Sequence, residues 1–273
     1  MIQCAVTLSL VPEARGGPFV FWDGLAADCA QAAAIGFAAV EVFPRAAEEL
    51  NAKELRQLLT QHSLKLAAMG TGGGWLVRQL RLTDPDATVR RRAREFVGAV
   101  IDLAGGFGAP AIIGSMQGRA EGAVTREQAL DWLREALEQL APRAHALGAP
   151  LLFEPLNRYE TNLVRSIDEA LELLRPLRTK NVKLLCDLFH MNIEEADIAA
   201  ALRRAGALVG HVHFADSNRR AMGFGHTDVA PIAAALRETG YDGFVSAEVL
   251  PLPDSDTAAH QTMTSFRRHF PRA

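Results

Sequence analysis

The chain has 273 residues, of which 49% are hydrophobic and 22% are charged, and its formal net charge is −3. This composition suits a globular protein with a large core, and it gives no basic field that would favour a nucleic-acid partner. No segment approaches the roughly 20 apolar residues of a membrane span. The three cysteines are far apart, no Cys-x-x-Cys pair occurs, and the first residues lack the pattern of a signal peptide, so we expect a cytoplasmic protein.

Apolar runs that suit buried strands alternate with segments of helical spacing along the whole chain. The predicted strands cover residues 2–10, 37–43, 64–69, 110–116, 150–154, 182–187, 209–214 and 243–249. The predicted helices cover residues 24–35, 47–62, 83–107, 125–147, 166–174, 197–204, 229–239 and 257–270. Capping-box patterns at Thr125 with Gln128 and at Ser166 with Glu169 mark two of the helix starts.

The strict alternation of these elements predicts parallel strands joined by right-handed crossovers. Eight strand–helix units over this length favour a closed α/β barrel, a single (β/α)8 domain over residues 1–273, rather than an open doubly wound sheet. The glycine-rich turns at 70–74 and 105–108 do not form a dinucleotide-binding fingerprint.

The last four predicted strands each end in a side chain that can bind a metal ion. In chain order these side chains are Glu154, Asp187, His213 and Glu248. Active sites of such barrels form at the carboxyl ends of the strands, so we expect the four to converge at one rim. Three carboxylates and one imidazole suit a divalent cation, with Mn²⁺ as the first choice and Mg²⁺ or Co²⁺ as alternatives. The absence of thiolates argues against a structural zinc site.

Further polar residues follow these strand ends, in predicted loops over the same rim. Glu160 comes six residues after the first strand end, His190 three after the second, and Arg219 six after the third. We expect this group to face a hydroxylated substrate. Two positions are less clear. Glu41 either contacts substrate or closes an internal ion pair, while His211 belongs to the barrel interior rather than to the metal shell.

Three segments carry a resemblance to a known family: Phe-Glu-Pro-Leu-Asn-Arg-Tyr-Glu at 153–160, Asp-Leu-Phe-His-Met-Asn-Ile-Glu-Glu at 187–195, and His-Val-His-Phe-Ala-Asp-Ser-Asn-Arg at 211–219. They resemble the sugar phosphate isomerase/epimerase family with a xylose-isomerase-like TIM barrel. Within it they are most similar to the ketose 3-epimerases that act on D-tagatose, D-allulose or L-ribulose. The N-terminal half matches only in its strand–helix rhythm.

The resemblance implies an isomerase, a metal-dependent ketose 3-epimerase. Such an enzyme removes and returns the proton at C3 of a free ketose through an enediolate that the cation stabilises. The four strand-end residues would be the metal ligands, and Glu154 and Glu248 would also be the acid and base. Glu160, His190 and Arg219 would bind the O1–O3 end of the sugar.

Other functions use similar residues and stay open. An aldose–ketose isomerase of the hydroxypyruvate isomerase type, or an isomerase of keto-inositols or sugar phosphates, could work with the same site. A phosphate could bind at Arg220 and the backbone near Gly223 and Gly225, although a mobile loop with one substrate arginine is the simpler interpretation.

Two further classes fit the sequence less well. A DNA repair enzyme similar to endonuclease IV would need more histidines at strand ends, and a catalytically silent sugar-binding module would not need both glutamates. We therefore expect a small sugar as the partner, without nucleic acid or membrane. Apolar loops after the first and third strands suit a homo-oligomer, either a dimer or a tetramer.

Overall fold

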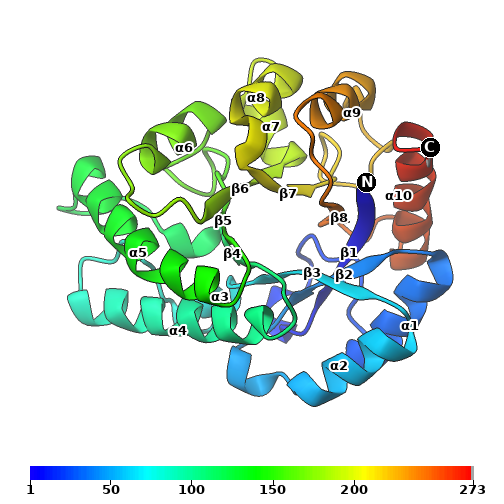
Figure 1. Ribbon diagram of the computed structural model, residues 1–273, viewed down its shortest axis with the longest axis horizontal. Coiled ribbons are helices and arrows are strands. Elements are labelled where there is room, and N and C mark those ends of the chain that lie inside the picture. Colours follow the sequence, from blue (N-terminus) through cyan, green and yellow to red (C-terminus); the bar gives the residue numbers. More distant parts are fainter. Residues whose placement is uncertain (272–273) are drawn as a thin grey trace.

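The computed structural model describes residues 1–271 and shows eight parallel strands closed into a barrel, with helices arranged around it (Figure 1). The strands pair in chain order, and β8 closes the barrel against β1. Their bounds are β1 Gln3–Ser9, β2 Ala39–Phe43, β3 Lys65–Gly70, β4 Ala111–Ile113, β5 Leu151–Phe153, β6 Val182–Asp187, β7 Val209–His213 and β8 Phe244–Ala247. The predicted α/β barrel is therefore confirmed.

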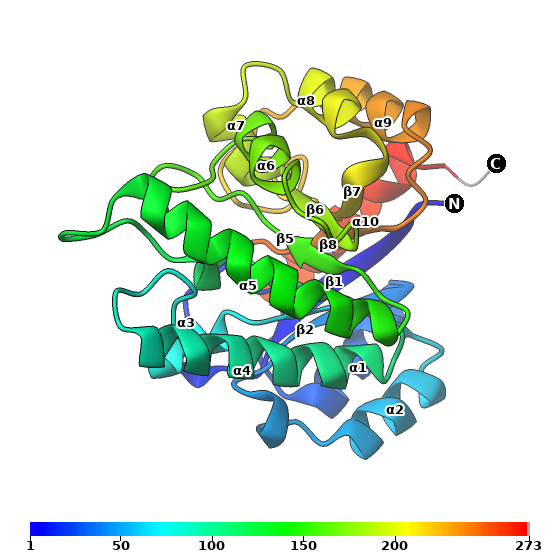
Figure 2. The ribbon, with the colours of Figure 1, turned by 60° about the vertical axis from the view of Figure 1, so that its left-hand side comes forward.

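The helices cover the outside of the barrel, and Figure 2 shows α4 and α5 side by side over β4 and β5. The α-helices are α1 Leu25–Ile35, α2 Ala52–Gln61, α3 Gly73–Arg78, α4 Ala87–Gly105, α5 Arg126–Ala146, α6 Ile167–Leu174, α7 Leu188–Glu194, α8 Ile198–Ala205, α9 Val229–Glu238 and α10 Ser255–His269. Short 3-10 turns are η1 Pro12–Ala14, η2 Ala47–Glu49, η3 Ser115–Gln117 and η4 Gly206–Leu208. No helix among residues 1–271 is both long and apolar enough to span a bilayer.

Side-chain caps explain where the helices begin. Thr125 and Ser166 accept hydrogen bonds from the backbone N–H groups three residues later, as the capping-box patterns predict. The helix expected over 47–62 is instead divided, because the Asn51 side chain accepts from two following N–H groups and starts α2 at Ala52. In the same way Asp86 caps α4, which begins at Ala87 rather than at 83.

The barrel interior is apolar at one level and polar at another. Four buried side chains from β3 to β6 pack together there: Ala68, Ile112, Leu152 and Leu185. Toward the carboxyl ends of the strands the interior carries the buried polar side chains Glu41, His211 and His213. Buried polar groups are stable only with partners, and these three side chains lie together near the rim where barrel enzymes have their active sites.

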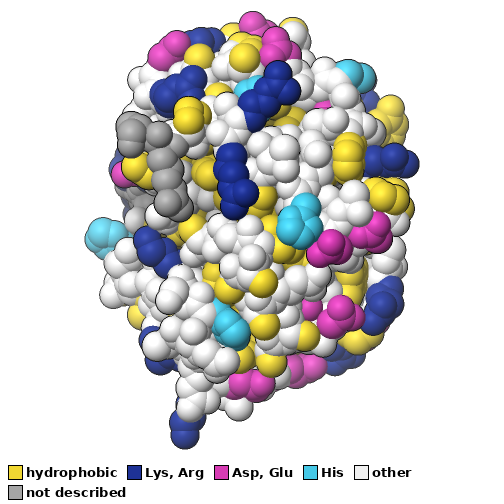
Figure 3. Space-filling model, turned by 90° about the vertical axis from the view of Figure 1, so that its right-hand side faces the viewer, with side chains coloured by type: hydrophobic (Ala, Val, Ile, Leu, Met, Phe, Trp, Pro, Cys, Tyr) yellow, Lys and Arg dark blue, Asp and Glu magenta, His cyan; other side chains and the backbone are white. Residues whose placement is uncertain are grey.

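The outer surface carries charges of both signs. On the face that carries α10, basic and acidic side chains are interspersed rather than gathered into one basic patch (Figure 3). Several ion pairs join exposed side chains, such as Arg91 with Glu95 and Arg203 with Glu238. Such pairs contribute little to stability, so the fold depends chiefly on its buried core.

Candidate metal centre and substrate pocket

Four side chains from neighbouring strand ends meet at one rim of the barrel. Asp187 and His213 are the last residues of β6 and β7, while Glu154 and Glu248 come just after β5 and β8. One nitrogen or oxygen atom from each of these residues lies within 4.8 Å of the corresponding atoms of the other three. The structure thus brings together the four residues that the strand-end pattern singled out.

The distances within this group fit a shared cation. His213 Nδ1 lies 3.6 Å from Glu154 Oε1 and 3.6 Å from Asp187 Oδ2. It lies 3.5 Å from Glu248 Oε2. Atoms that bind one ion through bonds of about 2.1 Å are themselves about 3 to 4 Å apart. A set of three carboxylates and one imidazole therefore has both the chemistry and the spacing for a divalent cation.

Orphaned polar atoms support the same conclusion. Within residues 1–271, Glu154 Oε1, Asp187 Oδ2 and His213 Nδ1 are buried and have no hydrogen-bond partner. Buried polar atoms are rarely left unpaired in proteins, because desolvating them without a partner is unfavourable. These three atoms face one another at the strand ends, so a cation bound among them would supply the missing interaction of each.

The remaining atoms of these residues are held by the fold. Asp187 Oδ1 accepts a hydrogen bond of 2.8 Å from the Phe189 N–H, which caps α7 and leaves Oδ2 directed at the cluster. Gln117 Nε2 donates to the backbone oxygen of Glu154 at 3.0 Å. Hydrogen bonds to the surrounding chain therefore hold Asp187 and the backbone of Glu154 in place.

Burial and mutual repulsion perturb the acidic groups. Burial, together with the charges of Glu248 and Asp187, raises the pKa of Glu154 to about 8. Burial likewise raises the pKa of Glu248, with Asp187 and Glu41 adding to it. Burial opposes ionisation of Asp187 as well, but His190 and His213 outweigh it and lower the pKa of that carboxyl. Two glutamates whose pKa values are both raised above the usual range can act as acid and base.

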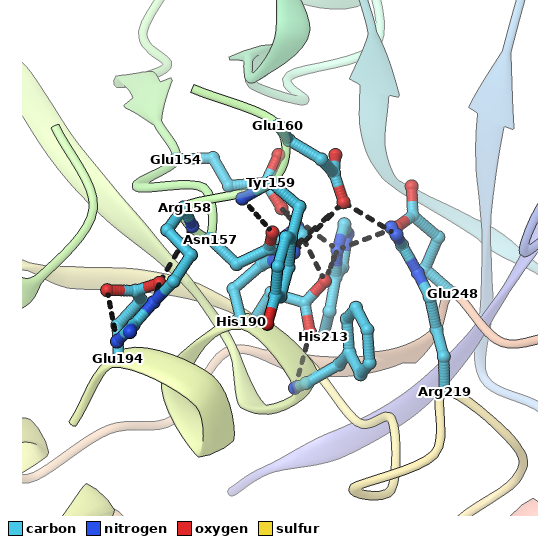
Figure 4. A network of polar contacts seen from close by, with 12 residues as sticks. Glu154, Asn157, Arg158, Tyr159, Glu160, His190, Glu194, His213, Arg219 and Glu248 are labelled. Atoms are coloured by element: carbon cyan, nitrogen blue, oxygen red, sulfur yellow. Dashed lines mark hydrogen bonds and ion pairs between the residues drawn. The ribbon is translucent and has the colours of Figure 1, made fainter. Parts of the chain in front are cut away.

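The three predicted substrate residues form a connected network beside the cluster (Figure 4). Arg219 donates from Nη1 to Glu160 Oε1 at 3.0 Å and from Nη2 to Glu248 Oε2 at 3.1 Å. Its guanidinium carbon lies 4.9 Å from the centre of the Phe189 ring. The backbone of Arg219 has φ of +59°, an uncommon value for a residue with a side chain. Such strain often accompanies a functional position.

His190 lies in α7 and not in the loop expected from the sequence, because Asp187 caps a helix immediately after β6. The Asn157 amide donates to His190 Nδ1 at 2.7 Å, so the ring proton is on Nε2. That nitrogen lies 3.5 Å from Asp187 Oδ2 and 3.8 Å from Glu154 Oε1. Burial lowers the pKa of His190, which favours a neutral ring that presents an N–H to the site.

Asn157 and Gln117 also hold the site, although the strand-end pattern does not single them out, and the structure shows which contacts Glu41 makes. Asn157 bridges the network, since its amide also donates to Glu160 at 3.0 Å, and its position midway between Glu154 and Glu160 was the available signal. Gln117 gave no signal, because it follows a short strand without a motif. Glu41 closes an internal ion pair with histidines of β7 and leaves no free oxygen among the described residues.

The cluster opens into a cavity of about 400 Å³, a size typical of sites for small molecules. Its lining combines the polar groups of the cluster with an apolar wall of Phe19, Phe43, Trp75 and Leu76, and Glu13 and Arg15 also border it. Trp22 is not part of the cavity wall; it packs against Phe19 and donates to the Phe19 carbonyl at 2.7 Å. Phe224 is likewise outside the cavity wall.

The loop between β7 and α9 is organised by the buried carboxylate of Asp216. It accepts hydrogen bonds from the backbone N–H groups of Gly223 at 2.7 Å and Gly225 at 2.8 Å. Ser217 and Thr227 donate to the other oxygen at 2.7 and 3.0 Å. The glycine N–H groups considered for a substrate phosphate are therefore already engaged within the protein.

Comparison with known proteins supports the fold and the resemblance. The model of the xylose isomerase-like TIM barrel family matches residues 29–269. The chain is 31% identical to D-psicose 3-epimerase of Ruminiclostridium cellulolyticum, over 68% of this chain and 67% of that protein. It is 35% identical to L-ribulose 3-epimerase of Mesorhizobium japonicum, over 61% of this chain but only 57% of that protein. A crystal structure of D-psicose 3-epimerase in the presence of D-fructose superposes with a TM-score of 0.81 at 22% identity, covering 99% of this chain and 100% of that one.

Asp216→Asn tests the loop carboxylate. Burial alone would raise the pKa of Asp216, but four backbone donors outweigh it and lower the pKa. The amide would turn an NH2 group toward N–H donors, so we expect the free energy of unfolding to fall by about 1–3 kcal/mol at pH 7. Because the folded pKa is lowered, the deficit relative to wild type stays constant above about pH 5 and shrinks below about pH 4.

Urea denaturation from pH 7 to pH 3.5 measures this difference. Asp228→Asn is the matched control, since Asp228 caps α9 from an exposed position and asparagine caps equally well. A deficit that is the same for both variants, or that does not change with pH, would contradict the role given to Asp216.

Proposed function

The chain belongs to the xylose isomerase-like TIM barrel family, and we propose that it is a metal-dependent ketose 3-epimerase acting on free ketoses. One observation carries the proposal. Glu154 and Glu248 approach the cluster from the two ends of the arc β5 to β8, and both have raised pKa values. Inversion at a carbon next to a ketone needs a group that removes a proton from one face and another that returns it to the other. The curated relatives named above, both 3-epimerases, support the same reaction.

In this proposal Glu154, Asp187, His213 and Glu248 hold a divalent cation, with Mn²⁺ as first choice and Mg²⁺ or Co²⁺ as alternatives. This assignment of the four ligands is supported by the spacing of their side chains and by the unpaired buried atoms described above. When bound, the cation polarises the ketone oxygen and offsets the negative charge of the enediolate.

The protein's own groups carry the proton. One of the two glutamates removes the C3 proton, and the other delivers a proton to the opposite face. Arg219 contacts Glu248 and offers N–H donors where negative charge develops on the substrate oxygens. Its hydrogen bond to Glu160 fixes the direction of the guanidinium before substrate arrives.

Glu160, His190 and Arg219 would bind the O1–O3 end of the sugar. All three line the cavity on the side of the cluster. A carboxylate, an imidazole N–H and a guanidinium offer both acceptors and donors for neighbouring hydroxyl groups. The opposite end of the sugar would face the apolar wall of Phe19 and Trp75.

An aldose–ketose isomerase is the alternative, because one of the same glutamates could return the proton to the neighbouring carbon. A phosphorylated substrate is less favoured, since Asp216 already engages the glycine N–H groups of the β7–α9 loop. We also propose a cytoplasmic location and a dimeric or tetrameric assembly. Light scattering on the purified protein would test the assembly.

Deuterium exchange identifies the reacting carbon. Mn²⁺-loaded protein would be incubated in D2O with free ketoses, hydroxypyruvate, keto-inositols and phosphorylated ketoses. We expect NMR to show deuterium entering C3 of a free ketose together with formation of its C3 epimer. Formation of an aldose product would favour the alternative, and a lack of exchange in every sugar would contradict both.

Glu248→Gln tests the proton-transfer role. The amide keeps an oxygen for the cation but cannot accept the C3 proton, so we expect kcat to fall at least 10³-fold, in line with loss of general base catalysis. Calorimetry should still detect Mn²⁺ binding. Glu127→Gln is the control, because Glu127 is exposed in the first turn of α5. Near-normal turnover in Glu248→Gln would refute the role.

Removal of the cation tests the metal requirement. We expect activity to disappear after treatment with EDTA and to return when Mn²⁺ is added, because the carboxylates alone offer no positive charge to the substrate oxygens. Thermal unfolding should shift to a higher temperature as Mn²⁺ binds the folded state. An enzyme whose turnover is indifferent to chelation does not use this mechanism.

A further inference from the structure

We infer that Glu41 is a positioning residue that orients His213 toward the bound cation, with His211 holding the other side of the Glu41 carboxylate. This inference rests on the proposed function, since it assumes that the cluster binds a metal ion. Glu41 does not belong to the group of four, and it comes from β2, on a different part of the barrel wall.

The contacts of Glu41 link it to the cluster through the far side of one ring. Its Oε1 lies 3.1 Å from His213 Nε2, and its Oε2 lies 2.7 Å from His211 Nε2. All three side chains are buried. His213 therefore has one ring nitrogen in a hydrogen bond with a carboxylate, while Nδ1 faces the carboxylates of the cluster without a partner among the described residues.

This arrangement selects one tautomer of His213. A carboxylate only accepts hydrogen bonds, so the proton of the neutral ring is placed on Nε2 and the lone pair on Nδ1. A metal-binding histidine needs that lone pair, and a carboxylate on the other nitrogen fixes the ring and strengthens it as a ligand. Glu41 thus supplies the support that a four-residue cluster would otherwise lack.

The backbone is irregular at the strand positions that this contact requires. The pairing of β2 with β3 shifts register between Val40 and Glu41. The pairing of β6 with β7 also shifts, and there Leu184 pairs with Val209 whereas Leu185 pairs with His211. Register shifts of this kind redirect side chains. Two of them, at Glu41 and beside His211, bring β2 and β7 side chains together across the interior.

Two other roles for Glu41 fit the distances less well. Glu41, His211 and His213 are close enough together to be considered as a second metal site. However, the 2.7 Å between Glu41 Oε2 and His211 Nε2 is a direct hydrogen-bond distance, shorter than the spacing of two ligands on one ion, and the 3.1 Å between Glu41 Oε1 and His213 Nε2 also suits a hydrogen bond. Glu41 also borders the cavity, but both of its oxygens are engaged, so a substrate contact would have to break a buried ion pair.

The test measures Mn²⁺ affinity by calorimetry on chelator-stripped protein without sugar. For Glu41→Gln we expect Kd to rise 10- to 100-fold, the usual effect of losing a carboxylate behind a histidine ligand. Glu41→Asp keeps the charge but is one methylene shorter, so it cannot reach both rings. Its Kd should lie between those of wild type and Glu41→Gln, and this variant keeps the test valid if Glu41→Gln does not fold.

A double-mutant cycle separates positioning from a general effect on charge or stability. In a His213→Ala background, Glu41→Gln should cause no further loss of Mn²⁺ affinity, because the residue acts through that ring. An equal loss in both backgrounds, an unchanged Kd in Glu41→Gln, or wild-type affinity in Glu41→Asp would overturn the inference. So would two Mn²⁺ ions per wild-type chain, since Glu41 would then be a ligand itself.

The same titration distinguishes the two levels of the proposal. Wild-type protein that binds no divalent cation would overturn the proposed metal-dependent function and this inference together. Wild-type protein that binds one cation, with variants that bind it equally well, would overturn only the inference. Activity is not needed for either outcome, so the result does not depend on having found the right sugar.

Discussion

The repulsion among three carboxylates clustered at one rim is the constraint on which the rest of the structure depends. Glu154, Asp187 and Glu248 surround one imidazole nitrogen, and because two of them are buried and Glu248 is half-buried, little water screens their charges. Like charges at such distances are tolerated only when protons or a cation intervene. The surrounding contacts are arranged to hold that unfavourable group in place, from the α7 cap to the ion pair of Glu41.

The fold provides the rigidity that this group needs. Each carboxylate or imidazole is placed at or next to the end of a strand, and the strands are locked by their neighbours on both sides of a closed barrel. Apolar side chains such as Ile112 and Leu152 pack together inside the barrel, and the histidines of β7 meet Glu41 at another level of the interior. Since the scaffold is preformed, binding energy need not be spent on assembling the site.

The features that the sequence predicts well are those with a local signature. Strand and helix alternation is local, and so is a ligand at the last position of an apolar run, which is why the barrel and the group of four were accessible. Contacts across the barrel have no such signature. Glu41 and His211 are 170 residues apart in sequence. Their contact lies beside register shifts in the strand pairing, which the pattern of side chains does not predict. The helix around His190 was missed for a related reason, because the residue that caps it was already assigned to the metal.

The environments of the two glutamates differ in a way that bears on their proposed roles. Glu248 accepts a hydrogen bond from Arg219, whose positive charge favours its ionised form, whereas Glu154 Oε1 has no such partner among the described residues. Of the two, Glu154 is therefore the better holder of a proton and Glu248 the better acceptor. A reversible epimerase must pass through both states, so the asymmetry would set which epimer is deprotonated by which residue. An aldose–ketose isomerase needs only one group to carry the proton between adjacent carbons. Two glutamates at opposite ends of the same arc, both with raised pKa values, are more than that reaction requires, and this excess is the physical reason for preferring inversion at C3.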